Sequence, residues 1–368
     1  MTFASDRLQH QQDVLARQQY DQQGQQQAAR TSRFKFEPQQ LMQMLRTRIV
    51  GQPHILDALE DMLNVVKADF NHPERPLSVT MLLGPTGVGK TETVRLISEA
   101  IHGHAHAFCR IDMNTLAQEH YAAALTGAPP GYVGSKEGNT LFDIEAIQGS
   151  FSKPGIVLFD EIEKASTEVV RALLNVLETG TLTLTAGTKS IDFRNCMIFM
   201  TSNVGAKESQ ARLQLLNKFP ARIADIAHRL KLDDREMTKR ALKHKFDPEF
   251  LNRIDRILYY QAIQSDEVQQ LIAIELEKLN RRLKRQGRAV TLSDSAAQWL
   301  AKDHDISYGA RGLVRKLRTH LEPILARYFL THPEVGQVRI SLKQQQLVVE
   351  RGAADQNILD QQHKHCSN

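Results

Sequence analysis

The fold is decided by the stretch Gly84-Pro85-Thr86-Gly87-Val88-Gly89-Lys90-Thr91. It matches the pattern GxxxxGK[ST], follows the apolar run Val79–Leu83 and opens a segment of helical periodicity. Glycines let the backbone N–H groups of such a loop wrap phosphate oxygens, and the N-terminus of the following helix adds positive potential. Lys90 would neutralise the β- and γ-phosphates, and the Thr91 hydroxyl would hold Mg²⁺. The motif therefore predicts a site for ATP and Mg²⁺.

A second motif expected in a phosphate-binding site, a pair of carboxylates, follows the apolar run Ile156–Phe159. Asp160 and Glu161 follow this run directly. Two adjacent carboxylates at the end of a buried strand are costly unless they serve a cation. We expect Asp160 to complete the Mg²⁺ shell and Glu161 to act as general base for the attacking water.

Short apolar runs alternate with helical segments in the part of the chain around these motifs. Continuous apolar strands between helices are typical of a parallel sheet covered on both faces. From Ala206 to Gln286 the chain contains no glycine and the periodicity becomes helical, and a strand pair is expected around 338–342 and 346–349. The sequence thus predicts an α/β fold, in which a P-loop domain with a parallel sheet covered by helices precedes a smaller, mainly helical lid domain.

Composition sets the boundaries of these domains. Ten of the first thirty residues are glutamine, so residues 1–33 are expected to form a flexible tail. The P-loop domain is placed at 34–260, the lid domain at 261–350, and a polar tail at 351–368. Short His/Cys tracts such as the one at 363–366 sometimes bind metal, but an ordinary polar terminus is the preferred interpretation.

Charge and cysteine usage exclude several classes of protein. The formal net charge of +5 is small for 368 residues and does not by itself predict a nucleic-acid partner. No apolar run approaches the length of a membrane span. Three widely spaced cysteines, Cys109, Cys196 and Cys366, fit a reducing compartment and not a disulfide scaffold. We expect a soluble, cytoplasmic protein that does not associate with membranes.

Further motifs follow one another along the chain. They are IVGQ at 49–52, GAPPGYVG at 127–134, FDEIEKA at 159–165, DFRN at 192–195, MTSNVG at 200–205, FDPEFLNRID at 246–255 and YGAR at 308–311. Together with the P-loop they resemble the Clp-type AAA+ ATPases, and most closely the second ATPase module of ClpB, ClpA and ClpV. The short Gln-rich segment has no room for the preceding modules of those proteins, so we expect a free-standing second module.

The resemblance implies roles for further residues. Asn203 matches sensor 1, which orients the lytic water beside the γ-phosphate. Arg253 matches the arginine finger that reaches the ATP of a neighbouring subunit, and Arg311 matches sensor 2 in the lid domain. The run Gly131-Tyr132-Val133-Gly134 matches the pore loop that grips a substrate polypeptide through an exposed aromatic ring.

Several positions depart from the family pattern. The second pore loop, at 182–193, is one residue longer and lacks the usual acid, which affects substrate handling but not ATP chemistry. Gly312 replaces the usual proline after GAR. The interval 204–252 lacks the Ile-Gly-Phe or Ile-Gly-Leu tripeptide with which relatives dock on the ClpP peptidase, so we expect no such partner.

These observations favour an ATP-driven protein remodelling motor of the unfoldase or disaggregase type. It would act as a homo-oligomer, expected to be a hexamer, that threads polypeptide through the pore of a ring. One alternative is a dedicated disassembly factor for one specific complex, as ClpV-like proteins are. Another is an AAA+ switch acting on nucleic-acid complexes, to which the basic run 281–288 would contribute. That run lacks interleaved aromatic residues, and an ordinary solvated helix end is preferred.

Overall fold

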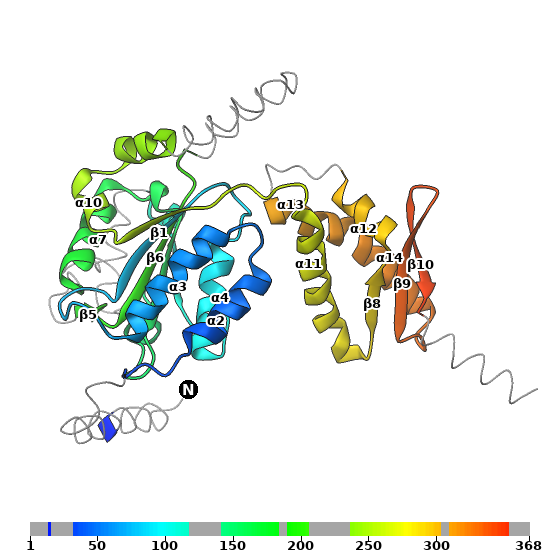
Figure 1. Cartoon of the computed structure of the whole chain (residues 1–368), viewed down its shortest axis with the longest axis horizontal. Helices are drawn as coiled ribbons and strands as arrows, with labels where there is room; N and C mark the ends of the chain where they lie inside the picture. Colours follow the sequence, from blue (N-terminus) through cyan, green and yellow to red (C-terminus); the bar gives the residue numbers. More distant parts are fainter. Residues whose placement is uncertain are drawn as a thin grey trace, which may run out of the picture. The chain divides into compact units, whose positions relative to one another are not determined.

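The computed structural model describes residues 14–15, 32–117, 141–183, 190–205, 236–302 and 309–352 (Figure 1). The chain divides into two compact units. The first comprises Met1–Gly84 and Lys90–Tyr260, and the second comprises Pro85–Gly89 and Gln261–Asn368. In the described part of the chain, no helix is both long and apolar enough to span a bilayer.

A five-stranded parallel sheet forms the centre of the first unit. Its strands, in spatial order, are β2 (Cys109–Asp112), β3 (Gly155–Asp160), β6 (Cys196–Ser202), β1 (Ser78–Leu83) and β7 (Arg256–Tyr259). Every residue of β1, β3 and β6 is buried, as expected for strands covered on both faces. The predicted parallel sheet is confirmed, and β7, which the apolar runs did not indicate, adds an edge strand beside β1.

Helices cover both faces of this sheet (Figure 1). One side carries α2 (Pro38–Arg48), α3 (Pro53–Lys67) and α4 (Lys90–His102), and the other carries α7 (Thr167–Thr179) and α10 (Pro248–Asn252). Alternate residues of a strand face opposite sides. Accordingly, Ser78 and Thr80 of β1 donate their hydroxyls to Met62 Sδ of α3, whereas Val79 and Met81 join the apolar core with α7.

Shorter elements complete the first unit. They are the 3₁₀ turns η2 (Met113–Leu116) and η4 (Ile162–Lys164), α6 (Ile144–Gln148), and the antiparallel pair β4 (Thr181–Thr183) and β5 (Ser190–Asp192). Asp143 and Ser166 cap the starts of α6 and α7 through their side-chain oxygens. The two caps fix the first residue of the helix that precedes β3 and of the helix that follows it.

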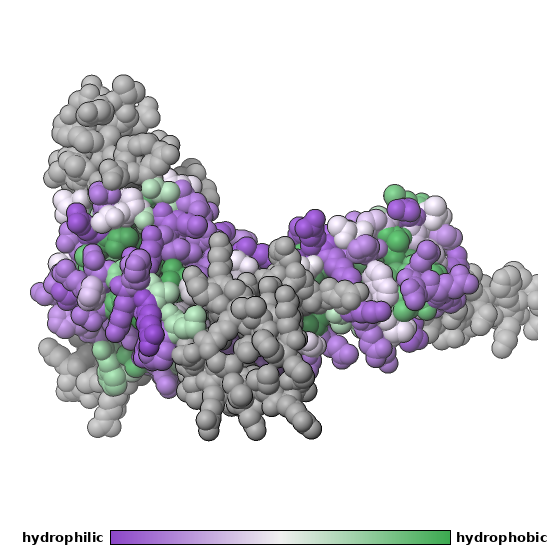
Figure 2. Space-filling model, turned by 90° about the horizontal axis from the view of Figure 1, so that it is seen from above, coloured by the Kyte–Doolittle hydropathy of each residue, from purple (hydrophilic) through white to green (hydrophobic). Residues whose placement is uncertain are grey.

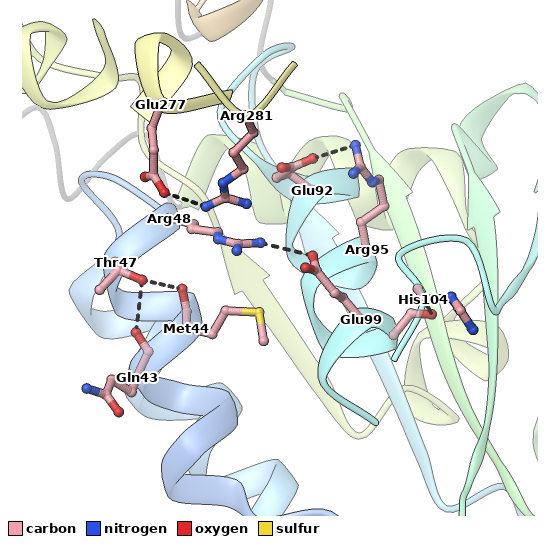
Figure 3. Close-up of polar contacts among 11 residues, drawn as sticks. Gln43, Met44, Thr47, Arg48, Glu92, Arg95, Glu99, His104, Glu277 and Arg281 are labelled. Carbon is pink, nitrogen blue, oxygen red and sulfur yellow. Dashed lines mark hydrogen bonds and ion pairs between the residues drawn. The ribbon is translucent and has the colours of Figure 1, made fainter. Parts of the chain in front are cut away.

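Polar contacts hold α2 against α4, the helix that starts at Lys90 (Figure 3). Arg48 Nη1 lies 2.9 Å from Glu99 Oε2, and both side chains are partly buried. Thr47 Oγ1 donates back to the carbonyls of Gln43 and Met44 in the last turn of α2. Within α4, Arg95 pairs with Glu92 one turn earlier. α4, the helix that follows the P-loop in sequence, is thereby held in place by its contact with α2.

Arg33 anchors the segment that enters the first unit. Its guanidinium lies 3.0 Å from Asp69 Oδ2 and 2.9 Å from Asn195 Oδ1, and it stacks on the ring of Phe34. Asn195 in turn donates to the carbonyls of Gln148 and Ser150. Of the predicted tail 1–33, the structure describes residues 14–15 and 32–33.

The second unit combines helices with a small sheet. Its helices are α11 (Val268–Leu283), η6 (Lys284–Gln286), α12 (Asp294–Ala301), α13 (Gly309–Lys316), the π-helical η8 (Leu317–Leu321) and α14 (Glu322–Thr331). β9 (Gln337–Lys343) pairs antiparallel with β10 (Gln346–Arg351), the expected strand pair, and parallel with β8 (Ala289–Leu292). The unit is therefore a mixed α/β domain and not only a helical one. Hydrophilic side chains cover much of its visible face (Figure 2).

Asp255 provides a test of how the sheet is held together. Its Oδ2 accepts the N–H of Val79 at 2.8 Å, and its own N–H donates to Val79 O. Asp255→Ala removes the acceptor for a buried N–H, so we expect the free energy of unfolding to fall by about 2 kcal/mol. Asp255→Asn keeps an acceptor oxygen and should lose less than half of that. Urea denaturation followed by circular dichroism measures both, and equal losses would contradict this role.

Candidate functional site

The carboxyl ends of three parallel strands meet at one edge of the large sheet. β1 and β6 pair so that Leu83 lies opposite Ser202, and β3 and β6 pair so that Phe159 lies opposite Met200. The residues that leave these strands therefore begin at the same edge. They are the P-loop from Gly84, the carboxylates Asp160 and Glu161, and the polar Asn203.

Lys90 links two of these elements. It begins α4, is 8% exposed, and donates from Nζ to Asn203 Oδ1 at 2.8 Å and to the carbonyl of Gly84. The backbone N–H of Asn203 donates to Glu163 Oε1 at 3.2 Å, which fixes the turn after β6. The predicted phosphate-binding lysine and the sensor-1 asparagine are thus in direct contact.

Gly84 must be a glycine because of its neighbour Tyr260. Its φ of +143° is rarely adopted by other residues, and a Cβ there would lie 2.6 Å from the carbonyl oxygen of Tyr260. The Tyr260 hydroxyl donates to Thr93 Oγ1 of α4 at 2.9 Å. Burial raises the pKa of Tyr260, so the phenol stays neutral and acts as a hydrogen-bond donor.

Asp160 is buried and has two different partners. It is 7% exposed, its Oδ1 accepts the Thr201 hydroxyl, and its Oδ2 lies 2.6 Å from Arg110 Nη2. The Arg110 side chain is half exposed, so this cation faces solvent while the carboxylate does not. Arg110, at the centre of β2, was not among the predicted site residues.

Glu161 is held in a conformation that non-glycine residues seldom adopt. Its φ is 57° and its ψ 52°, in the left-handed region, and its N–H donates to Thr201 Oγ1 at 3.0 Å. Asn114 Nδ2 donates to Glu161 Oε2 at 2.7 Å and also contacts Asp112. Asn114 therefore orients the proposed general base, and no sequence motif indicated it.

The two arginines with roles taken from the family, Arg253 and Arg311, belong to different units. Arg253 ends α10 and lies 2.7 Å from Glu178 Oε1, near the end of α7. Arg311 is an exposed residue of α13 in the second unit. One residue earlier, the N–H of Ala310 donates to the carbonyl of Gly87 at 2.8 Å, a contact within that unit.

The pore-loop residues Gly131, Tyr132, Val133 and Gly134 lie outside the described residues, as do 184–189 of the second pore loop. Their proposed role therefore remains a prediction from the sequence.

The two described cysteines are poor nucleophiles. Cys109 and Cys196 are buried, and desolvation raises the pKa of Cys109 to about 11 and that of Cys196 well above its usual value. Both thiols stay protonated near neutral pH. They pack as small apolar side chains in the core at the start of β2 and β6, the opposite ends of these strands from the site.

Much of the basic run 281–288 is engaged within the second unit. Arg281 pairs with Glu277 one turn earlier (Figure 3), and Arg282 pairs with Glu322 of α14. Arg288 lies over the ring of Phe329 at 4.6 Å. These contacts support the interpretation of a helix end whose charges are balanced internally, and they reduce the charge offered to a nucleic acid.

Family models match both units. The model described as the AAA domain (Cdc48 subfamily) matches residues 75–257, and the model described as the C-terminal, D2-small domain, of ClpB protein matches residues 263–340. The first begins before β1 and ends within β7. The second begins before α11 and ends within β9 of the smaller unit.

Several curated relatives are similar over most of this chain. The ATP-dependent protease ATP-binding subunit-like protein AmiB of Pseudomonas aeruginosa is 48% identical over 84% of this chain and 84% of its own. A Rhodococcus erythropolis protein, named ATP-dependent protease ATP-binding subunit-like protein, is 41% identical over 84% and 88%. ClpC of Staphylococcus epidermidis is 37% identical over 78% of this chain but only 34% of its own length. With its P-loop, acidic strand end and D2-type small domain, the chain belongs to the Clp-type AAA+ ATPases.

Proposed function

We propose that this ATPase is a protein-remodelling motor of the unfoldase or disaggregase type. It would work as a homo-oligomeric ring, a hexamer, that threads polypeptide through its central pore. The observation that carries the proposal is the convergence of Lys90, Asp160, Glu161 and Asn203 at one sheet edge in a Clp-type chain. This arrangement provides the hydrolysis that would drive the movement.

Mg²⁺ is part of the proposal, because the oxygen ligands at the site suit it. The Asp160 carboxylate and the Thr91 hydroxyl are hard oxygen donors, and Mg²⁺ typically takes one or two carboxylates together with nucleotide phosphates and waters. Bound there, the ion would neutralise charge on the β- and γ-phosphates. The Asp160 carboxylate would then contact both the metal and Arg110, because Arg110 donates to only one of its oxygens, Oδ2.

The remaining groups divide the hydrolysis between them. Lys90 neutralises phosphate charge, and Asn203, its contact, orients the attacking water. Glu161 accepts the proton of that water, and Asn114 sets the direction of its carboxylate. Gly84 and the N-terminus of α4 supply backbone N–H groups for the phosphates.

Glu161→Gln tests the assignment of the base. The variant retains Lys90, Thr91 and Asp160, so we expect it to bind ATP normally and to hydrolyse it at least ~100-fold more slowly. A fluorescent ATP analogue measures binding, and phosphate release measures turnover. Lys90→Ala is the matched control and should lose binding itself. Hydrolysis within a few-fold of wild type would remove Glu161 from the mechanism.

Arg253 is proposed to act on the ATP of a neighbouring subunit. Its ion pair with Glu178 is at the surface and partly solvated, so exchanging this partner for a phosphoryl group costs little. A guanidinium there would stabilise charge that develops on the transferred phosphoryl group. Arg311 is proposed to report nucleotide to the small domain from α13.

Mixing two inactive variants tests this interface. Arg253→Ala subunits keep an intact P-loop, and Lys90→Ala subunits keep an intact arginine. If Arg253 acts between subunits, mixtures should recover part of the ATPase activity, because some interfaces then pair both intact groups. Specific activity of the wild type should also rise with protein concentration. Full activity in a strictly monomeric fraction would contradict the proposal.

Tyr132 is proposed to grip the substrate polypeptide. Tyr132→Ala should leave the basal ATPase rate within a few-fold of wild type and abolish ATP-dependent unfolding of a fluorescent model protein. The conservative Tyr132→Phe retains an aromatic ring and should retain most of the unfolding activity. If Tyr132→Ala instead loses nucleotide binding, the residue has a structural role.

Two further parts of the proposal concern partners and location. Relatives are named as ATP-binding subunits of proteases, but the interval 204–252 contains a single glycine, Gly205, in the sensor-1 motif. It therefore lacks the glycine-centred apolar tripeptide that relatives present to ClpP, and we propose remodelling without a peptidase. We place the protein in the cytoplasm, where its free thiols remain reduced.

A further inference from the structure

A groove lies within the second unit, and none of the residues assigned a role above lines it. It has a volume of about 820 Å³ and lies between α12, the α13–η8 helix and the β9–β10 hairpin. α12 contributes Ser295, Gln298 and Trp299 to the lining, and Lys302, the residue directly after α12, also lines the groove. The lining residues of α13 and η8 are three or four positions apart and therefore share one side of the helix. Leu342 of β9 lines the end formed by the hairpin.

The described lining of the groove is basic. It includes Lys302, Arg315, Lys316 and His320 and contains no carboxylate. Lys302 and Arg315 are exposed, and among the described residues neither forms an ion pair. By contrast, Arg282, Lys343 and Arg351 of the same unit each pair with a glutamate. The groove thus presents two cations whose charge is available to a ligand.

An immobilised aromatic ring lies among these cations. Trp299 is the only tryptophan of the chain and is partly exposed. Lys316 Nζ lies 5.0 Å from its ring centroid and also donates to the carbonyls of Trp299 and Lys302. The His320 ring meets the indole edge-on at 5.7 Å between centroids. A ring fixed in this way offers apolar contact area at little entropic cost on binding.

The backbone beside the groove is unusual as well. Leu317–Leu321 form a π-helix between α13 and α14, and the lining residues Thr319 and His320 lie in it. π-Helical turns are rare and are frequently found at functional sites, because they place side chains where a regular α-helix does not. The second unit therefore retains a less favourable backbone at the wall of its basic groove.

We propose that this groove binds an acidic linear segment of a partner protein. Carboxylates of the segment pair with Lys302 and Arg315, and an apolar side chain between them packs against Trp299 and Leu342. One fixed indole and two exposed cations suit such a short motif, whereas single-stranded nucleic acid requires several stacking rings along a basic track. The surface would recruit substrates or adaptors independently of the pore and of ATP hydrolysis.

Tryptophan fluorescence tests the proposal in the full-length protein, since all tryptophan emission arises from Trp299. The probe is a synthetic peptide, Glu-Glu-Asp-Leu-Phe-Asp-Glu-Glu, which contains no tryptophan. We expect a saturable change in emission that weakens as salt increases. The same peptide with lysine in place of every acid should give no change.

Charge reversal supplies the matched variants. Lys302→Glu with Arg315→Glu should weaken peptide binding at least ~10-fold. Lys284→Glu with Arg285→Glu changes the net charge equally at exposed positions of the same unit outside the groove, and should bind like wild type. Unchanged ATPase rates and circular dichroism in both variants would show that they fold.

Four results would overturn the proposal. The first is no emission change with the acidic peptide, and the second is equal weakening in both charge-reversed variants. The third is an emission change with protein concentration alone, because the occupant would then be a second copy of the chain. The fourth is a stronger change with an oligonucleotide of equal charge, because the occupant would then be a nucleic acid. None of these results depends on whether the ATPase acts as an unfoldase.

Discussion

The parallel pairing of β6 with β3 on one side and β1 on the other determines where all the chemistry of the first unit lies. Leu83 opposite Ser202 and Phe159 opposite Met200 place the three strand ends side by side. A shift of one residue in either pairing would turn every side chain of that strand to the other face. Because all three strands are buried on both faces, such a shift would force every side chain to pack against the wrong set of helices. The close packing of the core therefore stabilises the register on which the site depends.

That register gives two neighbouring carboxylates different environments. Asp160 ends β3, is buried, and is compensated by Thr201 and the cation Arg110. Glu161 leaves the strand with a left-handed backbone and is held by the neutral amide of Asn114. The Glu161 carboxylate is partly exposed and is held by an amide, whereas the Asp160 carboxylate is buried and fixed by a hydroxyl and a guanidinium. The structure thus gives different surroundings to the two carboxylates for which we propose different roles.

The site residues predicted from local patterns are those whose neighbours in sequence are also their neighbours in space, whereas Asn203, Arg253 and Arg311 were predicted only from the family resemblance. Lys90 and Asp160 belong to strand–loop and strand–turn patterns that are complete within a few residues. Arg110 and Asn114 were not predicted, because their partners come from β3 through the pairing of Asp112 with Asp160. β7 was missed for a similar reason: it is a short, partly buried strand that is defined by its long-range pairing with β1. The parallel pairing of β8 with β9 likewise joins strands that α12, α13, η8 and α14 separate along the chain.

The two units differ in whether the charges at their sites already have partners, and we expect them to bind different ligands for this reason. In the first unit, charges at the sheet edge already have partners, as Asp160 has Arg110 and Lys90 has Asn203. A nucleotide must replace such contacts with equivalent ones, which demands a particular geometry and makes the site selective for phosphates. In the groove of the second unit, the exposed cations Lys302 and Arg315 have no carboxylate to give up among the described residues. Binding there would depend on the spacing of charges around one apolar side chain, a requirement that many short segments can meet and that suits recruitment rather than catalysis.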